Sequence, residues 1–209
     1  MRNGVVNMSI EKNMDPRVKR TRKLLQQAFM ELLQEKGFSS ISIQDIAERA
    51  TVNRATFYAH FLDKYALMDS IIREQFQQFV LDRLAAAPDR GGASLAVLIR
   101  ATFDFLREFH HDCKPSDARF DPLLERAIQQ ELAETLLNQL KQAPASNRER
   151  QVPAKTLALV VSWAIFGSAI HWARNGQTPS AEEMSNQVLM VFTEGAVCPA
   201  LGLLAEERA

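Results

Sequence analysis

Residues 41–67 read ISIQDIAERATVNRATFYAHFLDKYAL, and this stretch decides the fold. Its apolar residues recur at the three- and four-residue spacing of helices. Two polar residues, Ser42 and Asn53, stand where helix N-caps are needed, and an acidic residue follows Ser42 by three positions, as in a capping box. The pattern therefore predicts a short helix over residues 42–50, a tight turn, and a second short helix over residues 54–61.

The second of these helices is predicted to have two different faces. On a helical wheel, Phe57 and Phe61 face inward, whereas the small residues Ala55 and Ala59 face outward. A helix that enters the major groove of DNA needs small residues at the point of closest approach. Arg54, at the leading end, can donate two hydrogen bonds to a guanine edge. The helix is therefore a candidate for DNA recognition.

A longer helix is predicted ahead of these two, from about Pro16 to Lys36. Its apolar stripe follows the spacing of a buried helix face and consists of Leu25, Ala28, Phe29 and Leu32. Gly37 ends it, since glycine readily adopts the backbone conformation found at helix ends. Three helices joined by short turns are the plan of a helix-turn-helix bundle.

Basic residues are concentrated near the N-terminal end of the chain. Residues 1–64 hold eleven Lys and Arg against seven Asp and Glu, whereas the whole chain has 25 of each. Five of these cations are predicted to form a flexible basic arm that meets DNA: Arg17, Lys19, Arg20, Arg22 and Lys23. The alternative is an ordinary solvated surface, which is the usual explanation when no helix-turn-helix follows.

Helical spacing continues through the rest of the chain, and no segment alternates as strands do. We therefore expect an all-α protein. Further helices are predicted over about residues 64–86, 94–111, 121–142 and 153–175, with a last one from Ser180 that closes before Pro199. The expected organisation is a flexible tail (1–15), a three-helix homeodomain-like helix-turn-helix bundle (16–62) and a C-terminal helical ligand-binding and dimerisation domain (63–209).

Residues 156–173 form a run of 18 positions without a charge, at the lower limit of a membrane span. Several polar and small residues interrupt the run, so we interpret it as a helix buried within the protein or between subunits. The N-terminal residues lack the apolar core of a signal peptide. Cys113 and Cys198 are too few for a disulfide scaffold. These features favour a cytoplasmic protein that does not insert into a membrane.

The stretch over residues 41–67 resembles the DNA-binding signature of the TetR family of bacterial transcriptional regulators, and the similarity extends from about Arg22 to Leu67. It rests on residues at uninterrupted spacing, namely Ile46-Ala47, Val52, Thr56-Phe57-Tyr58, His60-Phe61 and Lys64. The resemblance implies that bases are faced by Gln44, Arg54, Ala55 and Thr56. It implies that phosphates are held by Ser42, Tyr58, His60 and Lys64. The family usually has glycine where this chain has Thr51, so a strained or differently bent turn is expected there.

The resemblance also implies a homodimer that binds a palindromic operator in double-stranded DNA and is released by a small-molecule effector. The dimer would form through the last two long helices, and the effector would bind within residues 94–197. Aromatic and neighbouring residues are candidates for the effector site: Phe103, Trp163, Phe166, His171, Trp172 and Met190. Aromatic residues at helical spacing are also typical of an ordinary core, and this alternative stays open.

Other classes of function find less support in the sequence. Since it contains no Gly-rich phosphate loop, nucleophile elbow or metal-ligand spacing, we expect neither an enzyme nor a bound cofactor. The cluster over residues 110–113 (His, His, Asp, Cys) offers metal ligands by type, but sequence neighbours rarely converge on one ion, so a polar helix end is preferred. The remaining alternatives are an architectural helix-turn-helix module without effector response, and an enzyme or carrier without a role on DNA.

Overall fold

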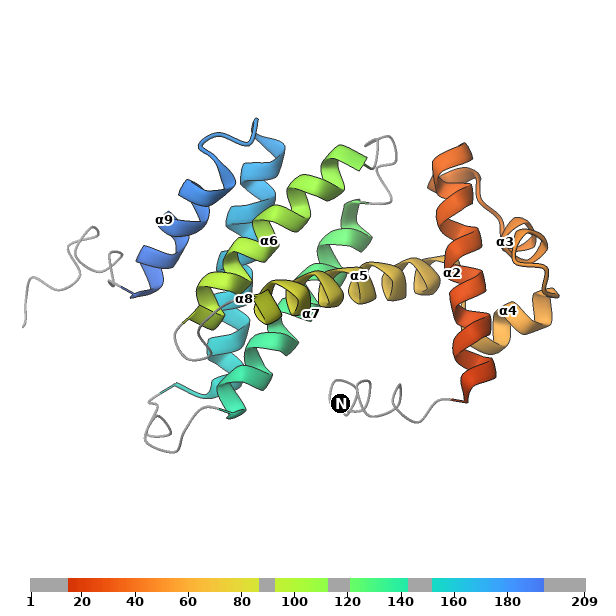
Figure 1. The fold of residues 1–209 in the computed structure, drawn as a ribbon, viewed down its shortest axis with the longest axis horizontal. Coiled ribbons are helices and arrows are strands. Elements are labelled where there is room, and N and C mark those ends of the chain that lie inside the picture. Colours follow the sequence, from red (N-terminus) through yellow and green to blue (C-terminus); the bar gives the residue numbers. More distant parts are fainter. Residues whose placement is uncertain (1–14, 87–92, 113–120, 143–151, 194–209) are drawn as a thin grey trace, which may run out of the picture. The chain divides into compact units, whose positions relative to one another are not determined.

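A computed structural model describes residues 15–86, 93–112, 121–142 and 152–193 (Figure 1). Within these ranges all regular secondary structure is helical, so the predicted all-α class is confirmed. The helices are α2 (Pro16–Lys36), the 3₁₀ helix η1 (Phe38–Ser40), α3 (Ile43–Arg49), α4 (Arg54–His60), α5 (Lys64–Ala86), α6 (Ala93–Asp112), α7 (Asp121–Gln142), α8 (Ala154–Arg174) and α9 (Ala181–Thr193). Residues 1–14 of the expected tail, Cys113, Cys198 and the side chains of residues 110–112 lie outside the described part.

The chain divides into two compact units. The first consists of Met1–Gln75 with Pro115–Glu134, and the second of Phe76–Lys114 with Thr135–Ala209. The described part of the first unit therefore contains α2, η1, α3, α4 and the first parts of α5 and α7. Because α5 and α7 each continue from one unit into the other, the N-terminal unit includes more of the chain than residues 16–62.

In the first unit, α3 and α4 pack against one side of α2 (Figure 1). The apolar stripe predicted for α2 is the face that it buries: Leu25, Ala28, Phe29 and Leu32. Gly37 ends the helix with a positive φ of 73°, and the ring of Phe38 directly after it is buried. The Phe38 ring meets that of Phe29 edge to face, with 6.1 Å between the ring centroids. These contacts fix the direction in which the chain enters α3.

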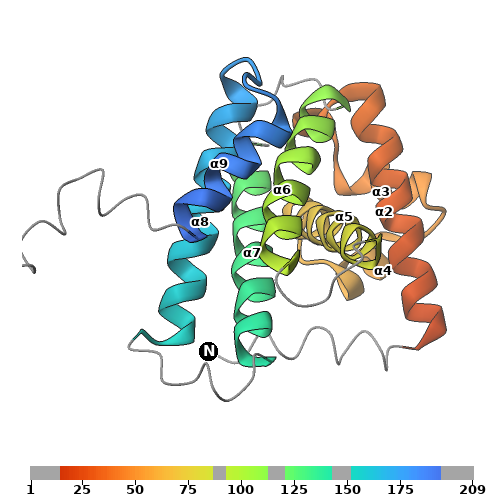
Figure 2. The ribbon, with the colours of Figure 1, turned by 60° about the vertical axis from the view of Figure 1, so that its left-hand side comes forward.

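In the second unit, α6 packs against both α8 and α9 (Figure 2). The core between them is formed by large apolar side chains, among them Leu98, Ile99, Phe103, Ile165, Phe166 and Trp172. Trp172 also closes the connection between α8 and α9, because its Nε1 donates a hydrogen bond to the Pro179 carbonyl at 2.7 Å. Ser180 caps α9 as predicted, since its Oγ accepts from the Glu183 amide at 3.2 Å.

One carboxylate lies inside the second unit. Asp104 on α6 is only 3% exposed. Its Oδ2 atom lies 2.8 Å from Arg83 Nη1 on α5 and 3.0 Å from Arg100 Nε, and its Oδ1 atom lies 3.1 Å from Arg107 Nη2. A buried charge is costly unless it is paired, so these guanidinium groups are what allow a carboxylate at this position. The cluster ties the end of α5 to α6.

Candidate nucleic-acid interface

An N-cap and two buried phenylalanines hold α4 in place. The Asn53 Oδ1 atom accepts a hydrogen bond from the Thr56 amide at 2.7 Å, as predicted for this cap. Phe57 and Phe61 are both buried, with ring centroids 6.0 Å apart, which confirms that this face points inward. A helix of this length is not stable alone in water, so its position is set by these contacts.

The turn that leads from α3 into α4 is a Schellman motif. The Val52 amide donates to the Ala47 carbonyl at 2.9 Å, and the Thr51 amide donates to the Glu48 carbonyl at 3.0 Å. Thr51 has a φ of 57°, in the left-handed region that favours glycine. The expectation of an unusual backbone at this position is confirmed. The chain keeps the conformation of a glycine turn although it carries a β-branched residue there.

The outward face of α4 carries two alanines and one cation. Ala55 and Ala59 are exposed, as the helical wheel predicted. Arg54 and Tyr58 are also exposed and lie one helical turn apart, with Arg54 Nη2 donating to Tyr58 Oη at 3.5 Å. Because this hydrogen bond is long, the guanidinium of Arg54 remains accessible at the N-terminal end of α4, beside the small side chains of Ala55 and Ala59. Such an arrangement suits a base edge in the major groove.

Next to it, α3 begins with the predicted capping box. The amide and the hydroxyl of Ser42 donate to Asp45 Oδ2 at 2.7 and 2.6 Å, and the Asp45 amide donates to Ser42 Oγ at 3.1 Å. Lys36 Nζ lies 2.9 Å from the same carboxylate oxygen. The hydrogen bonds from Ser42 and Lys36 hold the pKa of Asp45 well below its usual range. Gln44 is exposed on the first turn, where its amide donates to Glu48 at 2.5 Å.

His60 and Arg22 lie together at the end of α4. The imidazole of His60 is half-buried, and burial together with the charge of Arg22 lowers its pKa. Both effects favour the neutral form of the imidazole. The Arg22 guanidinium stacks on the Phe61 ring at 4.5 Å from the centroid, and its Nη2 lies 3.8 Å from Glu74 Oε1 on α5. Arg22 thus joins α2 to α4 and α5.

Lys64 has partners that the sequence did not predict. Its ammonium lies 3.0 Å from the Phe38 carbonyl oxygen, 3.3 Å from that of Ser39 and 2.7 Å from that of Ile41. The expected partner was a DNA phosphate, whereas the structure shows the side chain directed into the first unit. Residues 38–41 lie more than twenty positions earlier in the chain, so the helical spacing around Lys64 contains no sign of this contact.

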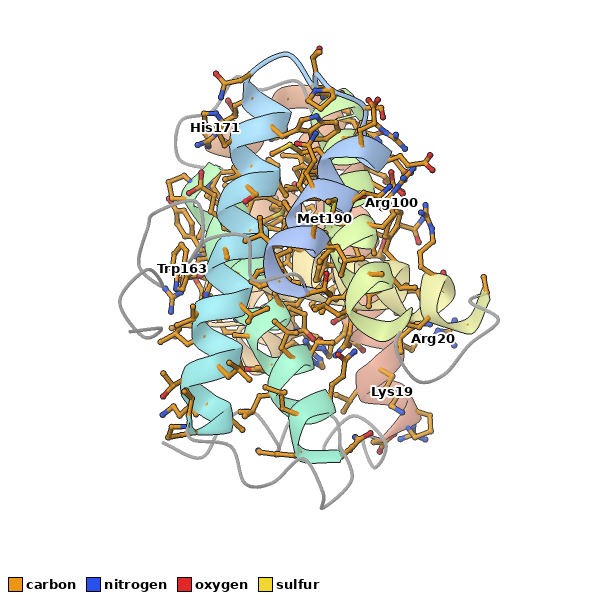
Figure 3. All side chains as sticks on the ribbon, turned by 90° about the vertical axis from the view of Figure 1, so that its left-hand side faces the viewer. Lys19, Arg20, Arg100, Trp163, His171 and Met190 are labelled. Atoms are coloured by element: carbon orange, nitrogen blue, oxygen red, sulfur yellow. The ribbon has the colours of Figure 1, made fainter. Side chains whose placement is uncertain are left out.

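The predicted basic arm is part of a helix. Its five residues lie in the first two turns of α2 and not ahead of it. Four of them are exposed, namely Arg17, Lys19, Arg20 and Lys23; Lys19 and Arg20 are labelled in Figure 3. The first turn of α2 contains no acidic residue, and Asp15 caps it by accepting from the Arg17 amide at 2.8 Å. Cations are unfavourable at a helix N-terminus, so an external anion would stabilise this end.

The six residues predicted for an effector site do not gather in one place. Phe103 and Trp172 are buried side by side, with 5.4 Å between their ring centroids, and Phe166 is buried on the same helix as Trp172. In contrast, Trp163 is 55% exposed and His171 is also exposed, both on the other face of α8. Figure 3 shows these two side chains on the outside of the helix, and Met190 on α9.

A further apolar surface lies on the outside of α8 and α9, and sequence reasoning did not resolve it into residues. Its exposed large side chains are Leu159, Val160 and Trp163 on α8, with Met190 and Val191 on α9. By length and mean hydropathy α8 could cross a membrane, although such a helix also occurs in the core of soluble proteins. The uncharged run over residues 156–173 was the sequence signal. It indicated that the helix needs a partner but not which face would meet it.

The N-terminal part of the chain is similar to known bacterial regulatory proteins. Residues 25–71 match the bacterial regulatory proteins of the tetR family. The HTH-type transcriptional regulator YxbF of Bacillus subtilis is 38% identical over 86 residues, and YdeS of the same organism is 37% identical over 87 residues. These matches cover 41% and 42% of this chain but only 22% and 41% of the two relatives. A shorter match, 32% over 62 residues, is to DhaS of Lactococcus lactis, the transcriptional activator of the dhaKLM operon.

Solved structures resemble the chain over most of its length. The TetR-family repressor FadR of Thermus thermophilus, solved with lauroyl-CoA, has a TM-score of 0.56 at 22% identity and covers 83% of this chain and 94% of its own. FadR of Bacillus subtilis, solved with stearoyl-CoA, has a TM-score of 0.50 at 18% identity and covers 83% and 98%. Identities this low establish a shared fold and nothing finer.

Proposed function

We propose that this chain, whose residues 25–71 match the bacterial regulatory proteins of the tetR family, is a transcriptional repressor that binds a palindromic operator as a homodimer and is released by a small-molecule effector. The observation that carries the proposal is the surface of α4. Its buried phenylalanines hold the helix on the first unit, and its exposed face presents Arg54 beside small residues. That combination serves recognition in a groove and has no evident use in a folded core.

On this proposal the contacts to DNA divide into two kinds. Gln44, Arg54, Ala55 and Thr56 face bases, with Arg54 donating its two parallel N–H groups to a guanine. Phosphates are met by Ser42, Tyr58 and His60, together with the exposed cations at the start of α2. The lowered pKa of His60 favours the neutral imidazole, which donates a ring N–H to a phosphate.

The dimer is proposed to form through the outer surfaces of α8 and α9. Five large apolar side chains are exposed there, and a Cβ added to Gly167 on α8 would meet nothing within 4 Å. Exposed apolar side chains gathered on two helices are typical of a protein–protein interface. In a two-fold dimer each copy offers the same surface to the other, so α8 and α9 meet their own equivalents. Two α4 helices about 34 Å apart would then enter successive major grooves.

The effector is proposed to bind beside the buried aromatic residues of the second unit. Phe103 on α6 and Phe166 and Trp172 on α8 are all aromatic, so a site beside them would favour the binding of a largely apolar small molecule. Trp163 belongs instead to the proposed dimer surface, and His171 lies on the same outer face of α8. The effector would release DNA by binding one conformation of the dimer more tightly than the other. We propose that α8 is covered by protein and not by lipid, and that the protein acts in the cytoplasm.

The test is DNA binding by the purified protein to a fragment from upstream of its own gene. We expect a complex whose affinity falls steeply with salt, exceeds that for a scrambled fragment, and is abolished by an effector. Lauroyl-CoA is the first ligand to try, because it is bound to the Thermus thermophilus relative. Equal binding to both fragments would favour an architectural module, and no salt-dependent binding would refute a role on DNA. Transcription in the presence of the protein separates repression from activation, the role named for DhaS.

A further inference from the structure

The ammonium of Lys64 is fully engaged inside the first unit. A lysine ammonium has three N–H donors and no acceptor. Three backbone carbonyls, those of Phe38, Ser39 and Ile41, lie within 3.3 Å of it. The charge also lies 4.8 Å from the centroid of the Phe38 ring and 5.9 Å from that of Tyr65. Each donor therefore has an acceptor before DNA arrives.

These carbonyls belong to the segment that leads into α3. Phe38 and Ser39 lie in η1, and Ile41 directly precedes Ser42, the N-cap of α3. Phe38 and Ile41 are each only 2% exposed, whereas Ser39 is exposed, so water has limited access to two of these three residues. If the ammonium turned outward to a phosphate, carbonyls at the end of η1 would lose their partner, at a cost in free energy. The lysine is better placed to organise the interface than to contact the ligand.

We infer that Lys64 is a positioning residue, which fixes the entry of α3 from the first residue of α5 and does not bind phosphate. The inference rests on the proposed DNA-binding function. It assigns Lys64 a different role from the exposed cations of α2, such as Lys19, although both residues are lysines in the same unit. Removing either charge weakens DNA binding, but for different reasons, and salt dependence separates the two.

The variant that tests this is Lys64→Met, which keeps the apolar stem and removes the ammonium, with Lys19→Met as the matched control. Affinity for the operator fragment is measured across a range of salt concentrations, at a temperature where both variants are fully folded. For Lys64→Met we expect affinity to fall about tenfold at every salt concentration, as on loss of one hydrogen bond to a charged group, with the salt slope unchanged. For Lys19→Met we expect the slope to fall by about 0.9, as on loss of one phosphate contact.

Two further readouts guard against a variant that does not fold. In the wild-type protein, the NMR signal of the Lys64 Nζ–H groups should be protected from exchange with water without DNA and remain unshifted when the fragment is added. In Lys64→Met, amide hydrogen exchange should accelerate over α3 but not over α8. A purely stabilising role would leave the affinity of the folded variant unchanged and would overturn the inference.

A salt slope reduced by about 0.9 in Lys64→Met, or an Nζ signal that becomes protected only with DNA, would also overturn it. Failure of the wild-type protein to bind the fragment would instead count against the proposed function. The exchange measurements on the free protein would still report whether Lys64 organises α3.

Discussion

Replacement of Thr51 by glycine should stabilise the protein. Thr51 occupies the left-handed position of the Schellman motif between α3 and α4, with a φ of 57°. A residue with a Cβ pays about 1–2 kcal/mol for this conformation, and a β-branched side chain lies at the upper end. Glycine avoids that cost but loses about 0.5–1 kcal/mol through the greater freedom of the unfolded chain. The expected net gain for Thr51→Gly is therefore about 1–1.5 kcal/mol in the free energy of unfolding.

The gain is measured by urea unfolding followed by circular dichroism, as a higher midpoint with an unchanged slope. Thr51→Ala is the matched control, because alanine keeps the Cβ and hence most of the strain, so it should give less than half of the effect. Gly37→Ala should act in the opposite direction, because Gly37 has a φ of 73°. A Thr51→Gly protein that is less stable than wild type, or no more stable than Thr51→Ala, would refute the account of a strained turn.

Three further predictions concern the interface, the dimer and the response to pH. Arg54→Ala should cost about 1–3 kcal/mol in binding to the operator and little in binding to a scrambled fragment, as measured by fluorescence anisotropy; equal losses on both would show that Arg54 binds phosphate. Trp163→Lys should shift the protein toward monomer in sedimentation experiments, whereas Leu81→Lys, which alters an equally exposed apolar residue on α5, should leave the dimer intact; the reverse pattern would place the interface elsewhere. The lowered pKa of Asp45 means that the unfolded chain binds more protons, so its stabilising effect is present above a pH of about 4 and is lost as the pH falls through the lower pKa of the folded state. Melting temperatures of Asp45→Asn should therefore fall less steeply than those of wild type below a pH of about 4, and parallel curves would contradict this origin of the acid response.

The elements that the sequence predicted best are those fixed by local chemistry. The ends of α3, α4 and α9 follow from side chains that bond to amides a few positions away, as Asn53 does to Thr56. The inward face of α4 follows from the spacing of Phe57 and Phe61, because a helix of known pitch leaves little choice. These interactions lie within one or two helical turns, so a single sequence contains all the information that specifies them.

Contacts between distant segments could not be predicted in the same way. Trp163 and Phe166 are three positions apart on α8 and are both aromatic, yet Trp163 is exposed and Phe166 is buried. Packing against α6 and α9 covers one face of α8, and the sequence of α8, apolar almost all round, does not reveal which face that is. The predicted effector residues consequently mixed a core face with an exposed face.

The same limit applies to charge, and it changes what the excess of basic residues over residues 1–64 means for DNA binding. Several of these cations are committed within the first unit: Arg22 to Glu74, Lys36 to Asp45, Arg49 to Glu31 and Glu35, and Lys64 to backbone carbonyls. The salt dependence of DNA binding reports only the charges that exchange counterions for phosphates. On the proposed function, this salt dependence comes from the exposed cations of α2, and not from the total number of lysines and arginines. A net positive charge of the right size would serve equally well for nonspecific attraction. The division into cations that build the fold and cations that remain at its surface is what makes a specific interface, because only a rigid α3 and α4 can hold Arg54 at one register on DNA.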